Sequence, residues 1–236
     1  MSGGTFRWKA AIVWMTIIAA PLSAAAQEPK AKPTNPIGTW TNTKVTNEPA
    51  VTGIALDARQ LDTVKAVSKY FNELINLKGT FVQTNAEKQR LRGKFFVKRP
   101  GRLRFEYALP SKQLIVSDGT MLAIQDLDIN TDDRLSLDQT TFRLLLRKDV
   151  DLLRDARILE VQEADDLVIV SLQDKNIDTP GRIRLFMTKS PAYEIKEWVT
   201  TDAQGLDTRI EVANLVKTED IDTGLFKIVS PTMVKP

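Results

Sequence analysis

The chain has 236 residues, with 33 Lys and Arg, 30 Asp and Glu, no Cys and no His, for a formal net charge of +3. Without Cys and His, neither a Ser-His-Asp triad nor a Cys-His pair can form, and the usual zinc ligands are missing. The near balance of charges gives no electrostatic case for a nucleic-acid partner, and the length suits one large β domain or two small ones.

The first 26 residues have the pattern of a secretory signal peptide. Arg7 and Lys9 form a short basic region, an apolar run follows from Ala10 to Ala20, and Ala24-Ala25-Ala26 provides a small-residue cleavage site. The apolar run is shorter than the about 20 residues that cross a bilayer as a helix. We therefore expect cleavage after residue 26 and export of a soluble mature chain to the periplasm.

Residues 27–57 are rich in Pro, Lys, Thr and Asn without an apolar period, which is typical of a flexible leader. Between residues 58 and 77 the apolar side chains recur at helical spacing and predict an amphipathic helix, with Gly79 as its C-terminal glycine. These apolar side chains are Leu61, Val64, Val67, Phe71, Leu74 and Ile75. The remainder, residues 58–236, is expected to form a single domain.

Beyond Gly79 the apolar period falls to two, as in half-buried strands. The alternation begins at Phe81 and is cleanest over Arg102–Tyr107, and Pro100-Gly101 and Asp118-Gly119 mark turns. Two further strands follow in 113–117 and 121–125. Later candidate strands span residues 157–163, 167–173, 182–189, 193–200, 208–217 and 225–229.

Two local features add to this pattern. Ile195 and Val199 are expected to share one face of their strand, because they lie an even number of residues apart. The leucine-rich stretch 139–155 interrupts the strand rhythm and predicts one or two short helices. With about 10 or 11 strands and no βαβ rhythm, the sequence predicts a mainly β fold: an incomplete antiparallel barrel with helices at two points in the chain.

One block of sequence is informative about function. The segment Gly93–Tyr107, with Phe81-Val82-Gln83 before it and Leu114–Gly119 after it, resembles the periplasmic outer-membrane lipoprotein carrier family, LolA. The shared pattern is an amphipathic helix, F-x-Q, a strand ending in the basic block Lys98-Arg99-Pro100, an aromatic strand and V-S-D-G. The closing Phe226–Pro231 resembles the last strand of the family.

The resemblance implies a half-barrel closed by a helical lid over an apolar cavity that takes the acyl chains of lipoproteins. The cargo would come from an inner-membrane ABC-type release complex and pass to an outer-membrane acceptor or to the outer membrane itself. The resemblance also implies a monomer that is no enzyme and needs no cofactor or metal. Arg99 matches the arginine that holds the empty lid shut by bonding lid backbone carbonyls.

The expected cavity lining combines the aromatic strands with the leucine-rich stretch. Both Phe95 and Phe96 are apolar, so the sequence leaves open which of them points inward. The expected lining residues are Phe81, Phe95, Val97, Phe105, Tyr107, Leu114, Val116 and Leu145. Without the resemblance, the aromatic residues would be assigned to an ordinary core and Arg99 to the surface.

Three other functions remain open from the sequence. A carrier or sensor of free lipid or glycolipid would use the same half-barrel. A carboxylate-based glycosidase needs two acids facing one cleft, whereas acids such as Asp126 and Asp128 lie in polar, loop-like stretches. A structural assembly factor would offer a sheet edge to its partners.

Overall fold

A computed structural model describes residues 53–230 of the chain. All described residues belong to one compact unit of the chain. The predicted signal peptide and most of the predicted leader lie outside the described residues. The last leader residues, 53–57, are described and are already bonded to the fold, since the Ile54 N–H donates to the Ile158 carbonyl at 2.9 Å.

The first element is the predicted amphipathic helix, α1 (Ala58–Glu73). Its start is fixed by Asp57, whose carboxylate accepts from the Gln60 N–H at 2.8 Å, while the Gln60 side chain accepts from the Asp57 N–H at 3.1 Å. This reciprocal arrangement satisfies two backbone donors that the first turn of a helix leaves free. The buried face of α1 includes Val64 and Val67, both fully buried.

The prediction that the helix runs on to Gly79 was wrong. The helix ends at Glu73, and Gly79 lies inside the following strand, β1 (Asn76–Thr84), opposite Phe95. A Cβ atom on Gly79 would come within 2.8 Å of the Ala213 carbonyl oxygen and 2.9 Å of the Phe95 ring. This glycine therefore permits close packing in the sheet and does not terminate the helix.

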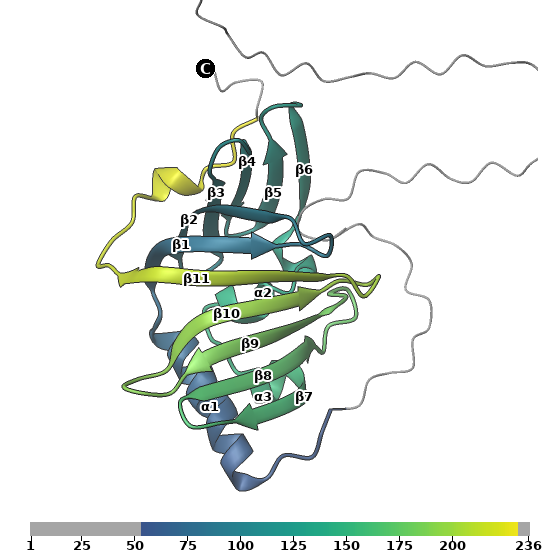
Figure 1. The fold of residues 1–236 in the computed structure, drawn as a ribbon, viewed down its shortest axis with the longest axis vertical. Helices are drawn as coiled ribbons and strands as arrows, with labels where there is room; N and C mark the ends of the chain where they lie inside the picture. The colour runs from purple at the N-terminus through teal and green to yellow at the C-terminus, as the bar shows by residue number, and fades with distance from the viewer. Residues whose placement is uncertain (1–52, 231–236) are drawn as a thin grey trace, which may run out of the picture. The chain divides into compact units, whose positions relative to one another are not determined.

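Eleven strands form one antiparallel sheet in the described residues (Figure 1). Two successive meanders, β1 to β6 and β7 to β11, are joined where β1 pairs with β11, so that β6 and β7 are the two edges of an open sheet. The predicted mainly β, unclosed antiparallel architecture is confirmed. The other strands are β2 (Arg90–Lys98), β3 (Arg102–Tyr107), β4 (Gln113–Asp118), β5 (Met121–Asp126), β6 (Thr131–Ser136), β7 (Ala156–Glu163), β8 (Leu167–Asp174), β9 (Arg182–Thr188), β10 (Glu194–Thr201) and β11 (Asp207–Lys217).

Two strand assignments differ from the prediction. The edge strand β6 was missed, because its sequence Thr-Asp-Asp-Arg-Leu-Ser has almost no apolar alternation. The predicted strand at 225–229 was wrong, since this region contains the 3₁₀ helix η2 (Thr223–Phe226) and then irregular backbone up to Ser230. Phe226 is buried where η2 contacts β3 and β4. Its apolar side chain therefore packs a helix against the sheet and does not belong to a strand.

The prediction that Ile195 and Val199 share a face was also wrong. The register of β10 shifts between Ile195 and Glu197, so one extra residue is inserted at Lys196. A bulge of this kind reverses the alternation beyond it. As a result Ile195 and Trp198 lie on one face, opposite Met187 and Leu185, and Val199 lies on the other.

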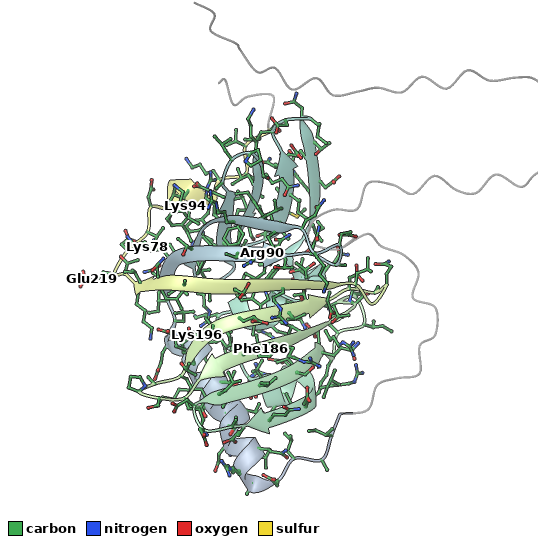
Figure 2. The ribbon with its side chains drawn as sticks, in the orientation of Figure 1. Lys78, Arg90, Lys94, Phe186, Lys196 and Glu219 are labelled. Carbon is green, nitrogen blue, oxygen red and sulfur yellow. The ribbon has the colours of Figure 1, made fainter. Side chains whose placement is uncertain are left out.

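The two faces of the sheet differ in character. The inner face packs with α1 and with the segment between β6 and β7 in one apolar core. Where η2 does not cover it, the outer face carries charged side chains, and Figure 2 shows Lys78, Arg90, Lys94 and Lys196 on it, together with Phe186. No described helix is long and apolar enough to span a membrane.

The two edge strands are connected by residues 137–155, called here the closing segment. It contains the 3₁₀ helix η1 (Leu137–Gln139) and the short helices α2 (Arg143–Leu146) and α3 (Leu152–Asp155). The short helices predicted within 139–155 are thus confirmed. Leu144, Leu146 and Leu152 are buried, so the segment contributes apolar side chains to the inner side of the sheet.

Candidate functional site

An apolar cavity of about 70 Å³ lies between α1, the inner face of the sheet and α2. Two of its lining residues, Arg99 and Trp198, carry polar side-chain groups, and every other lining side chain is apolar. The full lining consists of Phe71, Leu74, Leu77, Phe95, Val97, Arg99, Leu103, Phe105, Phe142, Leu145, Leu146, Leu185, Ile195 and Trp198. The site is therefore suited to an apolar ligand.

The cavity is small in this structure. An engineered apolar cavity of about 150 Å³ holds a molecule the size of benzene, so a cavity of this size is too small for a long hydrocarbon chain. A ligand of that kind requires the cavity to widen.

The closing segment is fixed to the β2–β3 turn and to the end of β8. The Gly101 N–H donates to the Leu146 carbonyl at 2.8 Å. The Arg143 guanidinium donates twice to the Asp174 carboxylate, at 2.8 and 3.0 Å, and the Asp174 side chain is fully buried. Bidentate pairs between arginine and a carboxylate are strong as a class, so this pair attaches α2 firmly to the end of β8.

Arg99 connects the closing segment to the end of α1. Its Nη1 donates to the Leu74 carbonyl at 3.4 Å, and its Nη2 donates to the Arg147 carbonyl. Burial lowers the pKa of the Arg99 guanidinium, but arginine stays charged in proteins. The position agrees with the expected lid-locking role, which stays a prediction.

The structure brings together five of the eight expected lining residues. Phe95, Val97, Phe105 and Leu145 line the cavity, and Tyr107 lines an adjoining cavity of about 20 Å³. Phe95 is the inward residue of the Phe95–Phe96 pair, with an exposed fraction of 2%. The register of β2 with β3 agrees, because Phe95 lies opposite Phe105 and Phe96 lies opposite Arg104.

The other three expected lining residues lie elsewhere. Phe81 is buried in the core, with its ring edge-on to Phe105 and Tyr107 at centroid distances of 5.0 and 5.1 Å. Leu114 and Val116 pair with Glu106 and Arg104, which places them on the outer face of the sheet. Apolar residues on both faces of β4 made that assignment ambiguous from sequence.

Sequence reasoning missed Trp198 as a lining residue. The bulge in β10 turns this side chain inward, and no signal in the sequence predicts that bulge. Phe142 and Leu146 also line the cavity, and the leucine-rich composition of 139–155 was a usable signal for both. The indole of Trp198 lies edge-on to the Phe105 ring, with centroids 6.2 Å apart.

The geometry gives no support to hydrolytic chemistry in this cavity. None of its lining residues is an Asp or Glu. Within residues 53–230, no group of three or more acidic side chains is placed to hold a metal ion. The acids that carry shifted pKa values, such as Glu106 and Glu163, are engaged in ion pairs with neighbouring basic side chains.

Comparison with known proteins identifies the family. The model of the family described as "Outer membrane lipoprotein carrier protein LolA" matches residues 72–229. The chain belongs to this family. LolA-family proteins are carriers and not enzymes, and the family is periplasmic.

Two relatives with similar sequences support the same assignment. The outer-membrane lipoprotein carrier protein of Leptothrix cholodnii is 28% identical over 74% of this chain and 84% of its own length. The protein of the same name from Alkalilimnicola ehrlichii is 30% identical over 74% of this chain and 83% of its own length. A solved LolA superfamily protein from Nitrosomonas europaea covers 70% of this chain and 97% of its own, with 12% identity and a TM-score of 0.40.

Proposed function

We propose that this chain carries lipoproteins between the inner and outer membranes by taking their acyl chains into the cavity on the inner face of the sheet. The observation that supports this most directly is an apolar cavity closed by a segment that a few hydrogen bonds hold in place. The mature carrier would begin after residue 26, with 27–57 as a leader and 58–236 as the carrier domain.

The energetics of such a carrier are consistent with the geometry. Moving an acyl chain from water into an apolar site gains about 0.8 kcal/mol per CH₂, or about 8 kcal/mol for ten of them. A hydrogen bond to a charged donor such as Arg99 contributes about 1.5–3 kcal/mol. Cargo can therefore offset the loss of the bonds that hold the closing segment, and release remains feasible because the net gain is smaller than the gross gain.

Within this proposal Arg99 is the lock of the closed state. Its guanidinium bonds the Leu74 carbonyl at the end of α1 and the Arg147 carbonyl in the closing segment. Removal of the guanidinium releases both carbonyls at once. The closing segment then opens at a lower free-energy cost. As a result the protein binds its cargo more tightly and releases it less readily.

The partners of the proposed carrier follow from the route of its cargo. An inner-membrane ABC-type release complex would load it, and an outer-membrane acceptor or the outer membrane itself would receive the lipoprotein. The resemblance to the family implies that the carrier acts as a monomer.

Binding of a synthetic lipopeptide tests the proposal. The mature protein and Arg99→Leu are titrated with a triacylated lipopeptide and, separately, with free palmitate, and the affinities are measured by fluorescence competition. We expect saturable binding of the lipopeptide, tightened about tenfold or more in Arg99→Leu because a charge-assisted bond is lost from the closed state.

The matched control is Arg92→Leu. Arg92 is an exposed arginine on the same strand, β2, but it is placed on the outer face. This variant is expected to bind as the wild type does. Binding of palmitate with no preference for the lipopeptide would favour a free-lipid carrier, and failure of every variant to bind either ligand would contradict the proposal.

A further inference from the structure

The main cavity and the smaller adjoining cavity, of about 20 Å³, are separated only by side chains that line both. The shared lining residues are Leu103, Phe105, Phe142 and Trp198. Leu103 and Phe105 belong to β3 and Trp198 belongs to β10, whereas Phe142 lies in the closing segment. Of the four, Phe142 is therefore the one that does not depend on the sheet for its position.

A row of paired residues across β9, β10, β11 and β1, which are neighbours in the sheet (Figure 1), gives the order of the two cavities. Leu185 lies opposite Trp198, Trp198 lies opposite Ile210, and Ile210 in turn lies opposite Gln83. Of the two cavities, Leu185 lines the main one alone and Trp198 lines both. Ile210 and Gln83 line the smaller one alone. Since neighbouring strands are about 4.8 Å apart, the smaller cavity continues the main one from β10 towards β1.

The inward residues of β3 give the same direction. Leu103 and Phe105 line both cavities, whereas Tyr107, the next inward residue, lines the smaller one alone. The Tyr107 hydroxyl donates to the Gln83 Oε1 at 2.5 Å, and both residues are buried. A hydrocarbon chain that extended past this pair would break a buried hydrogen bond and replace neither partner, which costs free energy. The pair therefore marks the end of the space that an apolar ligand can use.

From this order we infer that the two cavities form one acyl-chain site, in which the smaller cavity receives the methyl end and Ile210 determines the longest chain accepted. The inference rests on the proposed function and adds a specificity for chain length. When the closing segment opens, Phe142 is withdrawn from between the cavities and the chain passes over Trp198. Carbons that reach Ile210 still gain burial, and carbons beyond it gain none.

A series of peptides that carry one saturated acyl chain, from decanoyl to arachidoyl, measures this specificity. Affinities of the wild type and of Ile210→Ala are determined by fluorescence competition. We expect the wild-type affinity to rise about fourfold for each added CH₂ and then to level off, because further carbons find no apolar surface. In Ile210→Ala the affinity should level off at a chain longer by about two CH₂ groups, since the truncation lengthens the end of the site.

The matched control is Leu185→Ala, which removes as many carbon atoms from a buried residue of the same row. Leu185 lines the main cavity alone, so the affinities for all chains should change by one factor and the levelling point should stay. Partial unfolding of a variant also scales all affinities by one factor, so the levelling point reports the site and not stability. Ile115→Ala, which trims the smaller cavity from β4, is expected to give the same shift as Ile210→Ala and replaces it should that variant not fold.

An unchanged levelling point in Ile210→Ala would overturn the inference, and so would an equal shift in Leu185→Ala. A wild-type affinity that rises through the longest chain without levelling off would overturn it as well. Failure of the wild type to bind any of these acyl peptides would instead count against the proposed function itself.

Discussion

Asn72 and Val150 are joined by two hydrogen bonds: the Asn72 Nδ2 donates to the Val150 carbonyl and the Val150 N–H donates to the Asn72 Oδ1, both at 2.8 Å. A few residues on, the Leu152 N–H donates to the Ser68 Oγ at 3.2 Å. The end of the closing segment is thus fixed to α1, so we expect opening to move the part that precedes Val150.

The Asn72–Val150 contact leads to a prediction about stability. Asn72→Ala leaves the N–H and the carbonyl of Val150 without their side-chain partner, and each such buried group costs about 1–3 kcal/mol. We expect the free energy of unfolding, measured by urea denaturation, to fall by about 2–4 kcal/mol. Glu73→Ala, at the exposed neighbouring position, should change it by less than about 0.5 kcal/mol. Equal effects of the two substitutions would contradict this account.

The Arg143–Asp174 pair predicts strong coupling between α2 and the end of β8. Arg143→Met leaves the buried Asp174 carboxylate without its main partner, and breaking a buried pair from one side costs about 3–5 kcal/mol. The double variant Arg143→Met, Asp174→Leu removes both charges and should be less destabilised than the single variant. Additive losses in a double-mutant cycle would show that the pair is not coupled.

The contacts of the Glu163 carboxylate are expected to make the stability of the fold depend on pH. A hydrogen bond from Thr63 is the largest cause that holds the pKa of the Glu163 carboxyl below its usual range, with Lys189 and Arg59 adding to it. A carboxyl with a lowered folded-state pKa stabilises the fold above its unfolded pKa of about 4.3, and that stability is lost as the pH falls through the folded value.

The Glu163→Gln variant tests this sign. The difference in urea midpoint between the wild type and the variant should be largest near neutral pH and should shrink as the pH falls below about 4. A difference that stays constant from pH 7 to pH 3 would show that the charge of Glu163 does not contribute.

At Gly93 there is no space for a side chain between the strands. A Cβ atom there would lie 2.0 Å from the Glu106 carbonyl oxygen and 2.7 Å from the Phe81 ring, so the strands must separate to accept it. We expect Gly93→Ala to lower the free energy of unfolding by about 3 kcal/mol or more. Gly205→Ala, in a turn with open space and a φ of 81°, should cost about 1 kcal/mol. A well-folded Gly93→Ala of wild-type stability would contradict this reading of the β2–β3 pairing.

Local pattern predicted most of the fold. The Pro100-Gly101 and Asp118-Gly119 turns lie between paired strands, and the alternation over Arg102–Tyr107 gives one fully buried face. Apolar periodicity succeeds in such places because one face meets the core and the other meets solvent. It fails at β6, an edge strand whose ladder depends on backbone bonds and not on apolar side chains.

The cavity was harder to predict than the fold. Phe105 was placed there because its strand alternation and its family motif agree, whereas the orientation of Phe95 and Val97 was left open by the apolar residues on both faces of β2. Trp198 could not be placed, since its orientation depends on one inserted residue in β10 that periodicity does not reveal. Leu114 was misplaced to the cavity side because β4 carries apolar residues on both faces, and only its pairing with Glu106 shows the direction.

The most direct test of the central claim is to identify what the protein holds in its own cell. The mature protein and Arg99→Leu are purified from the periplasm, and their co-purifying material is measured by native mass spectrometry. We predict a one-to-one adduct with a lipid-modified protein that is more abundant in Arg99→Leu, because the closed state has lost its lock. An Arg99→Leu protein that is empty, or that holds free phospholipid alone, would contradict the claim.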